Sequence, residues 1–257
     1  MSISYIVLCF NDHENFKLTL DSLENELLID DELIVIDSSK DTEIAIDILK
    51  SKNFKCKVNN FYLDPSGVFP AYNFGVKKSS KKFIQKINSG DTLIKGARKI
   101  IQFNLEKFKD VSIFVYHQRT TGVGKNDLIF YPSSNSIWPL QSVIAEKQIF
   151  IKQGFYDESY KYNADQNFFM IARKVYKFKI FDDILTTYDS FGISAGFNCQ
   201  HFKEHFTLRK LQGHNTLVSF YLAGIRPFFR ICIQKIFGDR FVFFLKNKIF
   251  KHYKKIQ

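Results

Sequence analysis

Three apolar runs of strand length in the first ninety-one residues end in polar residues. They are Ile3–Cys9, followed by Phe10 and Asn11; Glu32–Asp37, which ends in its own carboxylate; and Phe83–Asn88, followed by Ser89, Gly90 and Asp91. Helical patterns separate these runs, and this alternation predicts βαβ units with a mainly parallel sheet. The carboxyl ends of parallel strands share one edge, where open α/β sheets bind ligands. We therefore expect Asn11, Asp37 and Asp91 to lie together at that edge.

The rest of the chain continues in the α/β pattern, less regularly in its second half. Strands are expected at 57–63, 111–118, 128–131 and 179–184, and helices at 69–78, 93–108, 148–154 and 164–175. The sequence lacks the dinucleotide fingerprint Gly-x-Gly-x-x-Gly and the P-loop motif. With 257 residues and 45% hydrophobic content, we expect one α/β domain with a C-terminal extension.

The polar residues at the strand ends also have a purely structural interpretation. Asp91 could cap the helix expected to start at residue 93, and Asp37 could cap the helix that follows Ser39. Asn11 and Asn73 could be turn residues without a ligand. The residues alone leave both interpretations open.

The sequence shows no feature of an exported or disulfide-bonded protein. No apolar run reaches the roughly eighteen residues of a membrane span, and the N-terminus does not resemble a signal peptide. The four cysteines form no Cys-x-x-Cys pair, so we expect reduced thiols. Cys199, His201 and His205 lack a fourth zinc ligand, and Lys203 and Glu204 between them indicate an exposed helix face. These features predict a cytoplasmic protein.

Nearly all of the net charge of +11 lies in the C-terminal fifth of the chain. Residues 207–257 hold eleven of the 37 Lys and Arg but one of the 26 Asp and Glu, and so carry +10. The large apolar residues there include Phe228, Phe229, Ile231, Ile236, Phe237, Phe241, Phe243 and Phe244. This composition is typical of a segment that binds an anionic membrane surface. Alternatively, the aromatic side chains pack on the main domain; no nucleic-acid partner is expected, because no RNA- or DNA-binding motif occurs.

Four segments resemble motifs of the family-2 inverting glycosyltransferases of the GT-A fold, in particular the bacterial enzymes of surface polysaccharide, lipooligosaccharide or capsule synthesis. They are residues 4–11, 32–39, 67–75 and 87–91, and a weaker likeness extends through 154–160 and 164–165 to about residue 196. The resemblance implies a GT-A domain over 1–200, with a nucleotide-sugar-binding half at 1–95 and an acceptor half at 96–200. A helical, basic tail would occupy 201–257.

The resemblance also implies a role for individual residues. The nucleotide-diphospho-sugar donor, expected to be UDP-linked, would contact Phe10, Asn11, Asp37, Asn73, Asn88 and Ser89. Asp91 would hold Mg²⁺ or Mn²⁺ against the diphosphate leaving group. Asp165 would be the base that deprotonates the acceptor hydroxyl. The implied activity is inverting transfer of a single hexose to a glycan or lipid-linked acceptor at the inner face of the cell membrane.

Departures from the family pattern favour an alternative function. Ser38 replaces the second acid expected after Asp37, and Gly90 stands where many relatives carry an acid in the metal motif. The alternative is a non-catalytic nucleotide-sugar-binding or glycan-binding protein with a decayed metal motif. The Gln-x-x-Arg-Trp motif of processive synthases is absent, so transfer of one sugar per binding event is expected.

Overall fold

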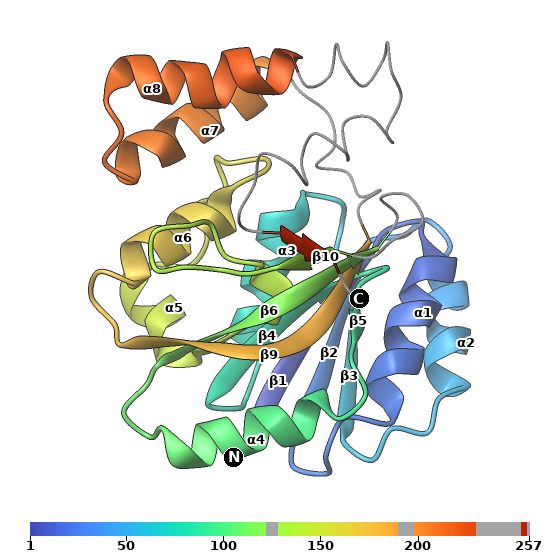
Figure 1. Cartoon of the computed structure of the whole chain (residues 1–257). Coiled ribbons are helices and arrows are strands. Elements are labelled where there is room, and N and C mark those ends of the chain that lie inside the picture. Colours follow the sequence, from blue (N-terminus) through green and yellow to red (C-terminus); the bar gives the residue numbers. More distant parts are fainter. Residues whose placement is uncertain (122–127, 190–197, 230–252, 256–257) are drawn as a thin grey trace.

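A mixed β-sheet with helices on both faces forms the body of the protein (Figure 1). The computed structural model describes residues 1–121, 128–189, 198–229 and 253–255. The strands are β1 (Ile3–Cys9), β2 (Glu32–Asp37), β3 (Lys57–Tyr62), β4 (Phe83–Asn88), β5 (Thr92–Leu93), β6 (Ile113–Thr121), β7 (Leu128–Phe130), β8 (Val143–Glu146), β9 (Phe178–Asp189) and β10 (Tyr253–Lys255). The helices are α1 (His13–Glu24), α2 (Thr42–Lys50), α3 (Val68–Lys78), α4 (Ala97–Lys107), α5 (Lys147–Gln153), α6 (Ala164–Ala172), α7 (Cys199–Leu211) and α8 (Thr216–Phe220), with a 3-10 turn η1 (Leu140–Ser142) and a π-helical turn η3 (Tyr221–Ile225).

The first four strands are parallel, and further strands extend the sheet beyond β4. The strand order is β10-β7-β6-β8-β4-β1-β2-β3, with β9 paired to both β5 and β6. β1 lies between β2 and β4, and β8 runs antiparallel to β4 and to β6. The carboxyl ends of β1, β2 and β4 are therefore neighbours at one edge of the sheet, the usual place for a ligand in an open α/β fold.

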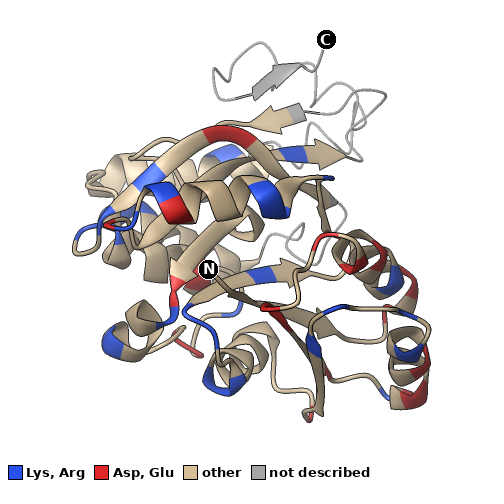
Figure 2. Cartoon of the chain, turned by 90° about the horizontal axis from the view of Figure 1, so that it is seen from below, with Lys and Arg blue, Asp and Glu red and all other residues tan. Residues whose placement is uncertain are grey.

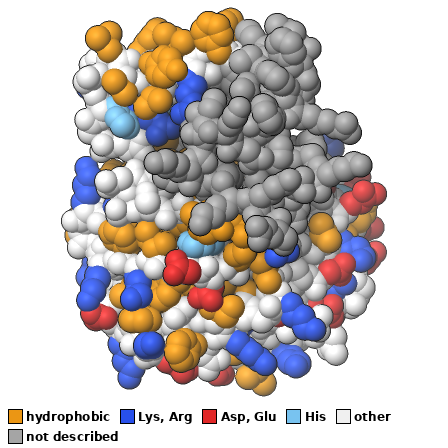
Figure 3. All heavy atoms as spheres, viewed as in Figure 1, with side chains coloured by type: hydrophobic (Ala, Val, Ile, Leu, Met, Phe, Trp, Pro, Cys, Tyr) orange, Lys and Arg blue, Asp and Glu red, His pale blue; other side chains and the backbone are white. Residues whose placement is uncertain are grey.

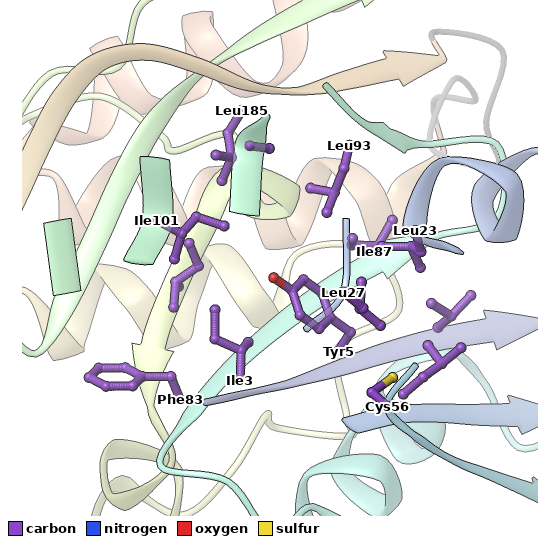
Figure 4. Packing of buried hydrophobic residues seen from close by; sticks show 14 of the residues in the cluster. Ile3, Tyr5, Leu23, Leu27, Cys56, Phe83, Ile87, Leu93, Ile101 and Leu185 are labelled. Carbon is purple, nitrogen blue, oxygen red and sulfur yellow. The ribbon is translucent and has the colours of Figure 1, made fainter. Parts of the chain in front are cut away.

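The parallel strands contribute to two hydrophobic cores, because successive side chains point to opposite faces of the sheet. On β1, Tyr5 packs in the core formed with α1 and α4, whereas Ile6 packs in the core formed with α3, α5 and α6. Figure 4 shows the first core, to which Leu23 of α1 and Ile101 of α4 contribute. Burial on both faces explains why these strands read as continuous apolar runs.

Several predicted elements are confirmed, and others were not foreseen. The strands at 3–9, 32–37 and 83–88 begin and end where the sequence predicts. β8 was not expected, and β9 extends well past the predicted end at residue 184. β8 has only four residues, and its partners β4 and β6 lie elsewhere in the sequence. A pairing of this kind leaves no local periodicity for sequence reasoning to detect.

The helix expected over 93–108 is wrong at its beginning. The start of that range belongs to β5, which pairs with β9, and α4 begins only at Ala97. Gly96, at a φ of 86°, precedes the helix. The Glu26 carboxylate accepts hydrogen bonds from the N–H groups of Gly96 and Arg98 at 2.7 and 3.1 Å. The helix start is therefore set by a carboxylate distant in sequence.

Helices α7 and α8 continue the chain beyond the sheet, so the expected helical tail is confirmed for these two helices. The prediction is wrong for Tyr253–Lys255, which form strand β10. The expected domain boundary between residues 200 and 201 falls inside α7, since this helix begins at Cys199. Strand β10 pairs with β7, so the last described residues return to the edge of the sheet. Among the helices of the described segments, none combines the length and the apolar sequence that a membrane span requires.

Charged side chains of both signs are spread over the domain. Figure 2 shows Lys and Arg interspersed with Asp and Glu. This distribution agrees with the charge of residues 1–206, which keep only +1 of the net charge of +11. The segment 230–252, which holds six of the eleven basic residues of 207–257, lies outside the described residues, as do 122–127, 190–197 and 256–257.

Candidate active site

The residues that follow β1, β2 and β4 lie side by side. In the parallel pairing, the last residue of β1 lies opposite Asp37, and Leu8 lies opposite Asn88. Asn11 continues from β1, and its Oδ1 accepts a hydrogen bond from the N–H of Lys40, in the loop after β2, at 3.0 Å. The structure thus brings the three strand-end loops to one edge of the sheet.

Asp37 has a buried carboxylate with one free oxygen. The side chain is 1% exposed, and Oδ1 accepts a hydrogen bond from the N–H of Ser39 at 2.9 Å. Oδ2 has no hydrogen-bond partner among the described residues. A buried polar atom without a partner costs about 1–3 kcal/mol, which a ligand hydrogen bond would offset. Helix α2 begins at Thr42 with Asp41 as its N-cap residue, so the capping role for Asp37 is wrong.

Phe10 and Asn11 form the turn after β1. Asn11 has a φ of 52°, in the left-handed region that Asn tolerates better than most residues. Its N–H donates to Ser39 Oγ at 2.9 Å. Phe10 is 52% exposed. Asn11 is therefore a turn residue whose side chain also fixes the loop after Asp37, and Phe10 presents its ring at the surface of the same edge.

Asp91 ends a tight turn that α1 holds in place. Its N–H donates to the Asn88 carbonyl at 3.1 Å, and its own carbonyl accepts from Thr19 Oγ1 at 2.9 Å. The side chain is 2% exposed. Gly90 has a φ of 91°, which strains other residues, so the turn itself accounts for glycine at this motif position. Because α4 starts at Ala97, the capping role for Asp91 is wrong.

Asn88 and Ser89 use their side chains within the protein. Asn88 Oδ1 accepts a hydrogen bond from the Tyr72 hydroxyl at 2.6 Å, and Ser89 Oγ donates to the Leu8 carbonyl at 2.6 Å. Both residues are half-buried. These hydrogen bonds fix the direction of the two side chains at the sheet edge, directly before the turn that carries Asp91.

The site offers few protein ligands for a metal ion. The described residues contain no group of three or more His, Cys, Asp or Glu side chains placed to enclose a metal. Asp91 is the carboxylate that the motif resemblance assigns to this role, and it lies buried just after the carboxyl end of β4. Mg²⁺ commonly binds through one or two carboxylates together with substrate phosphates. The residues present therefore fit a cation that binds together with a diphosphate.

Asp165 forms a buried ion pair with Lys86 of β4. Lys86 Nζ contacts Asp165 Oδ2, and the two side chains are 8% and 11% exposed. Asp165 Oδ1 accepts a hydrogen bond from the N–H of Gln166 at 2.8 Å. The N-cap residue of α6 is Asn163, so Asp165 lies in the first turn and is not the N-cap. Sequence reasoning missed Lys86, although a lysine inside an apolar strand is an unusual residue that could have been noticed.

Tyr72 connects this ion pair to the strand ends. The Tyr72 ring centroid lies 5.0 Å from Lys86 Nζ, and the hydroxyl donates to Asn88. Burial raises the pKa of Tyr72 well above its ordinary value, and the carboxylates of Asp91 and Asp165 raise it further. Both carboxylates therefore lie within electrostatic reach of one phenol group, which keeps its proton.

Asn73 of α3 contacts the loop after α5. Its Nδ2 donates to the Tyr156 carbonyl and to Glu158 Oε1, both at 2.8 Å, and its Oδ1 accepts from the Tyr156 N–H at 3.0 Å. These bonds anchor the loop after α5. A cavity of about 560 Å³ lies beside this loop, lined also by Asp157 and Asn167, between α3 and α6. Neither Asp37 nor Asp91 lines this cavity, and the donor-binding role of Asn73 stays a prediction.

The expected exposed face on α7 is wrong for Glu204, which is 4% exposed. Its carboxylate accepts hydrogen bonds from the N–H groups of residues 161, 162 and 163, directly before α6. The rings of His201 and His205 lie 4.3 Å apart, and burial lowers the pKa of His205 to about 4. Helix α7 therefore docks on the segment that leads to Asp165.

No protein-family model and no curated protein matches the chain. Several solved structures match it. S. aureus TarS 1–349 in complex with UDP-GlcNAc matches with a TM-score of 0.65 and 15% identity, over 85% of this chain and 69% of that chain. A second structure of S. aureus TarS matches with a TM-score of 0.64 and 15% identity over 85% of this chain, which spans 41% of that chain.

A structure from Pyrobaculum calidifontis also matches. Its mannosyltransferase PcManGT in complex with GDP-Man and Mn²⁺ matches with a TM-score of 0.61 and 12% identity, over 95% of this chain and 77% of that chain. These similarities cover 85% of the chain for the two TarS structures and 95% for the mannosyltransferase. They confirm the GT-A fold with its mainly parallel sheet.

Proposed function

We propose that this protein is a glycosyltransferase that moves one sugar from a nucleotide-diphospho-sugar to a glycan or lipid-linked acceptor. The observation that carries the proposal is the pair of buried carboxylates, Asp37 and Asp91, at the carboxyl edge of a GT-A sheet. Asp37 has an oxygen without a partner among the described residues. A charged hydrogen-bond acceptor in that position suits a ligand with N–H or O–H groups that donate hydrogen bonds, as a nucleoside has.

The donor would lie across the ends of β1, β2 and β4. Asp37 accepts hydrogen bonds from the nucleoside, and the exposed ring of Phe10 offers a surface beside it. A UDP-linked donor is supported by the motif resemblance and by the fold shared with TarS, whose structure holds UDP-GlcNAc. PcManGT has the same fold, and its structure holds GDP-Man. A donor with a purine nucleotide is therefore the alternative that the test below includes.

Asp91 would hold the Mg²⁺ or Mn²⁺ that accompanies the diphosphate. A divalent cation there neutralises the negative charge of the departing diphosphate. The chain's own contribution is the turn at 88–91, which Thr19 and Gly90 hold in one conformation. The mannosyltransferase of the same fold contains Mn²⁺ in its structure, which supports this part of the proposal.

Asp165 is the proposed base, and Lys86 is its positioning residue. Lys86 and the N–H of Gln166 hold one carboxylate oxygen each. Every carboxylate oxygen has two acceptor sites, so an acceptor hydroxyl can still donate to Asp165. In inverting transfer the acceptor oxygen attacks the anomeric carbon opposite the diphosphate and loses its proton to Asp165. The bond between the anomeric carbon and the diphosphate oxygen breaks as the new bond forms, so the nucleoside diphosphate leaves in the same step and no covalent enzyme intermediate forms.

The rival function is a non-catalytic nucleotide-sugar-binding protein. The observation that favours it is the ion pair itself, because Lys86 already contacts the carboxylate that the transfer reaction needs. Both functions predict donor binding at Asp37, so donor binding alone does not separate them. Acceptor-dependent release of nucleoside diphosphate does.

A screen of UDP-, GDP- and dTDP-sugars, each with and without Mn²⁺, tests the proposal. A ligand that binds only the native state raises stability, by about 2.7 kcal/mol at a hundred times its Kd. We expect one nucleotide class to raise the melting temperature, more strongly with Mn²⁺, and to release its nucleoside diphosphate when a glycan acceptor is added. No stabilisation by any donor would refute both functions; stabilisation without release for any acceptor would favour the rival.

A further inference from the structure

The segment 216–229, which comprises α8, η3 and the four residues after them, exposes a set of large apolar side chains. The exposed fractions are 83% for Leu217, 51% for Phe220, 51% for Tyr221, 56% for Phe228 and 59% for Phe229. We call these five residues the apolar face. Figure 3 shows hydrophobic side chains gathered at the top of the molecule, where Figure 1 places α8. Apolar groups clustered in this way mark interaction sites more often than scattered ones do.

The opposite side of the same segment packs against α7. Ser219 and Ala223, which do not belong to the apolar face, are buried. Phe220 of the apolar face also contacts α7, since its half-exposed ring lies 5.5 Å from the Phe202 ring. A Cβ on Gly224 would lie 2.7 Å from Phe202, so glycine permits this close approach. The apolar face is therefore the outer surface of a packed helical pair.

The charged residues next to the apolar face in the sequence are of one sign. No Asp or Glu occurs between Glu204 and Asp239, and Glu204 is buried against the segment before α6. Arg209, Lys210 and Arg226 are the charged residues of 205–229, and the sequence from 207 to the end carries +10. Each basic residue near an anionic membrane surface contributes about 1 kcal/mol of attraction.

We propose that the apolar face binds the surface of an anionic lipid bilayer. Aromatic and aliphatic side chains enter the boundary between headgroups and acyl chains, and the basic residues attract anionic headgroups. A second copy of this chain is a poor occupant, because pairing the face with itself would bring like charges together. The inference rests on the proposed function in one respect: membrane binding would bring the enzyme to a lipid-linked acceptor.

The attachment of α7 relates this surface to the candidate active site. Figure 1 shows α7 and α8 on the side of α6 away from α5, and Glu204 of α7 accepts three backbone hydrogen bonds directly before α6. Asp165 lies in the first turn of α6. The helical pair that would lie on the membrane is therefore fastened to the segment that leads to the proposed base.

Sedimentation of the full chain with vesicles tests the proposal. The probes are vesicles of phosphatidylcholine alone and of phosphatidylcholine with phosphatidylglycerol. We expect binding to the anionic vesicles that weakens with added salt. The variant Leu217→Ser/Phe220→Ser/Phe228→Ser should bind them about tenfold more weakly or worse, because three apolar side chains leave the interface. The control Phe103→Ser/Val175→Ser removes side chains that are 61% and 73% exposed elsewhere, and it should bind like the wild type.

Three results would overturn the proposal. They are equal vesicle binding by the triple variant and the wild type, equal binding to neutral and anionic vesicles, and a dimer in light scattering that the triple variant dissociates. Stabilisation by nucleotide-sugars, measured on the same variants, separates this proposal from the proposed function. Vesicle binding that depends on the apolar face without donor binding would refute the enzyme and keep the membrane surface. Donor binding without vesicle binding would refute the membrane surface and keep the proposed donor site.

Discussion

The ammonium group of Lys86 contacts the carboxylate of Asp165 across seventy-nine positions of sequence, and both side chains are buried. This contact joins β4, which leads to the Asp91 turn, to α6. A buried ion pair stabilises a protein only weakly as a pair, but removal of one partner leaves a charge without compensation. The pair therefore fixes how β4 and α6 lie relative to each other.

Lys86→Met should lower the free energy of unfolding by about 3–5 kcal/mol, because it leaves the Asp165 carboxylate buried without its cation. Urea denaturation measures the change. Adding Asp165→Asn to Lys86→Met should recover a large part of the loss, since the uncompensated charge is then gone. The control is Lys17→Met, which breaks an exposed pair with Asp21 and should cost about 0–1 kcal/mol. Additive losses in the double variant would mean that the two residues are not coupled.

Asp165→Asn should keep nucleotide-sugar and metal affinity near those of the wild type and abolish most of the transfer. A base takes up the acceptor proton but does little to hold the donor. Because the ion pair is broken, donor affinity and transfer rate are to be compared per folded molecule, at a temperature well below the melting point. The exposed Asp182→Asn serves as the control. A fully active Asp165→Asn would show that another residue is the base. Asp157 and Glu158 would be the next candidates.

Asp91→Ala should remove the additional stabilisation that Mn²⁺ gives in the presence of a nucleotide-sugar, and should lower turnover by orders of magnitude. The physical reason is the loss of the carboxylate that would share the cation with the diphosphate. Calorimetric titration of the nucleotide-sugar with and without Mn²⁺ gives a result independent of turnover. An unchanged effect of Mn²⁺ on donor affinity in this variant would exclude Asp91 from the metal role.

Glu204 should give the protein a pH-dependent stability. Burial alone would raise the pKa of Glu204, but hydrogen bonds from backbone N–H groups and from Gln200 lower it overall. A carboxyl with a lower pKa in the folded chain stabilises the fold above about pH 4.3, and this contribution is lost as the pH falls through the folded pKa. The difference in unfolding free energy between wild type and Glu204→Gln should therefore shrink on acidification. A difference that stays constant with pH would contradict this account.

The sequence predicts those parts of the fold and the site that depend on local periodicity. The strands that end at Asp37 and Asn88 could be located because buried strands read as apolar runs with polar ends. Pairings between distant segments could not be located in this way. The contact of Lys86 with Asp165 and the docking of Glu204 before α6 are of this kind, because no local pattern encodes them. The lysine within an apolar strand was the one feature of the sequence that indicated a buried partner for Lys86.

The most direct test asks whether the donor binds at the carboxyl edge of β2. The wild type and Asp37→Ala are both titrated with the nucleotide-sugar that stabilises the wild type. Asp41→Ala is the matched control, since Asp41 is exposed four residues further on and its side chain forms no capping hydrogen bond. Loss of a charged hydrogen-bond partner of the nucleoside should weaken donor binding in Asp37→Ala by about tenfold or more, with Asp41→Ala unchanged. Equal donor affinity in all three proteins would contradict a donor site at Asp37.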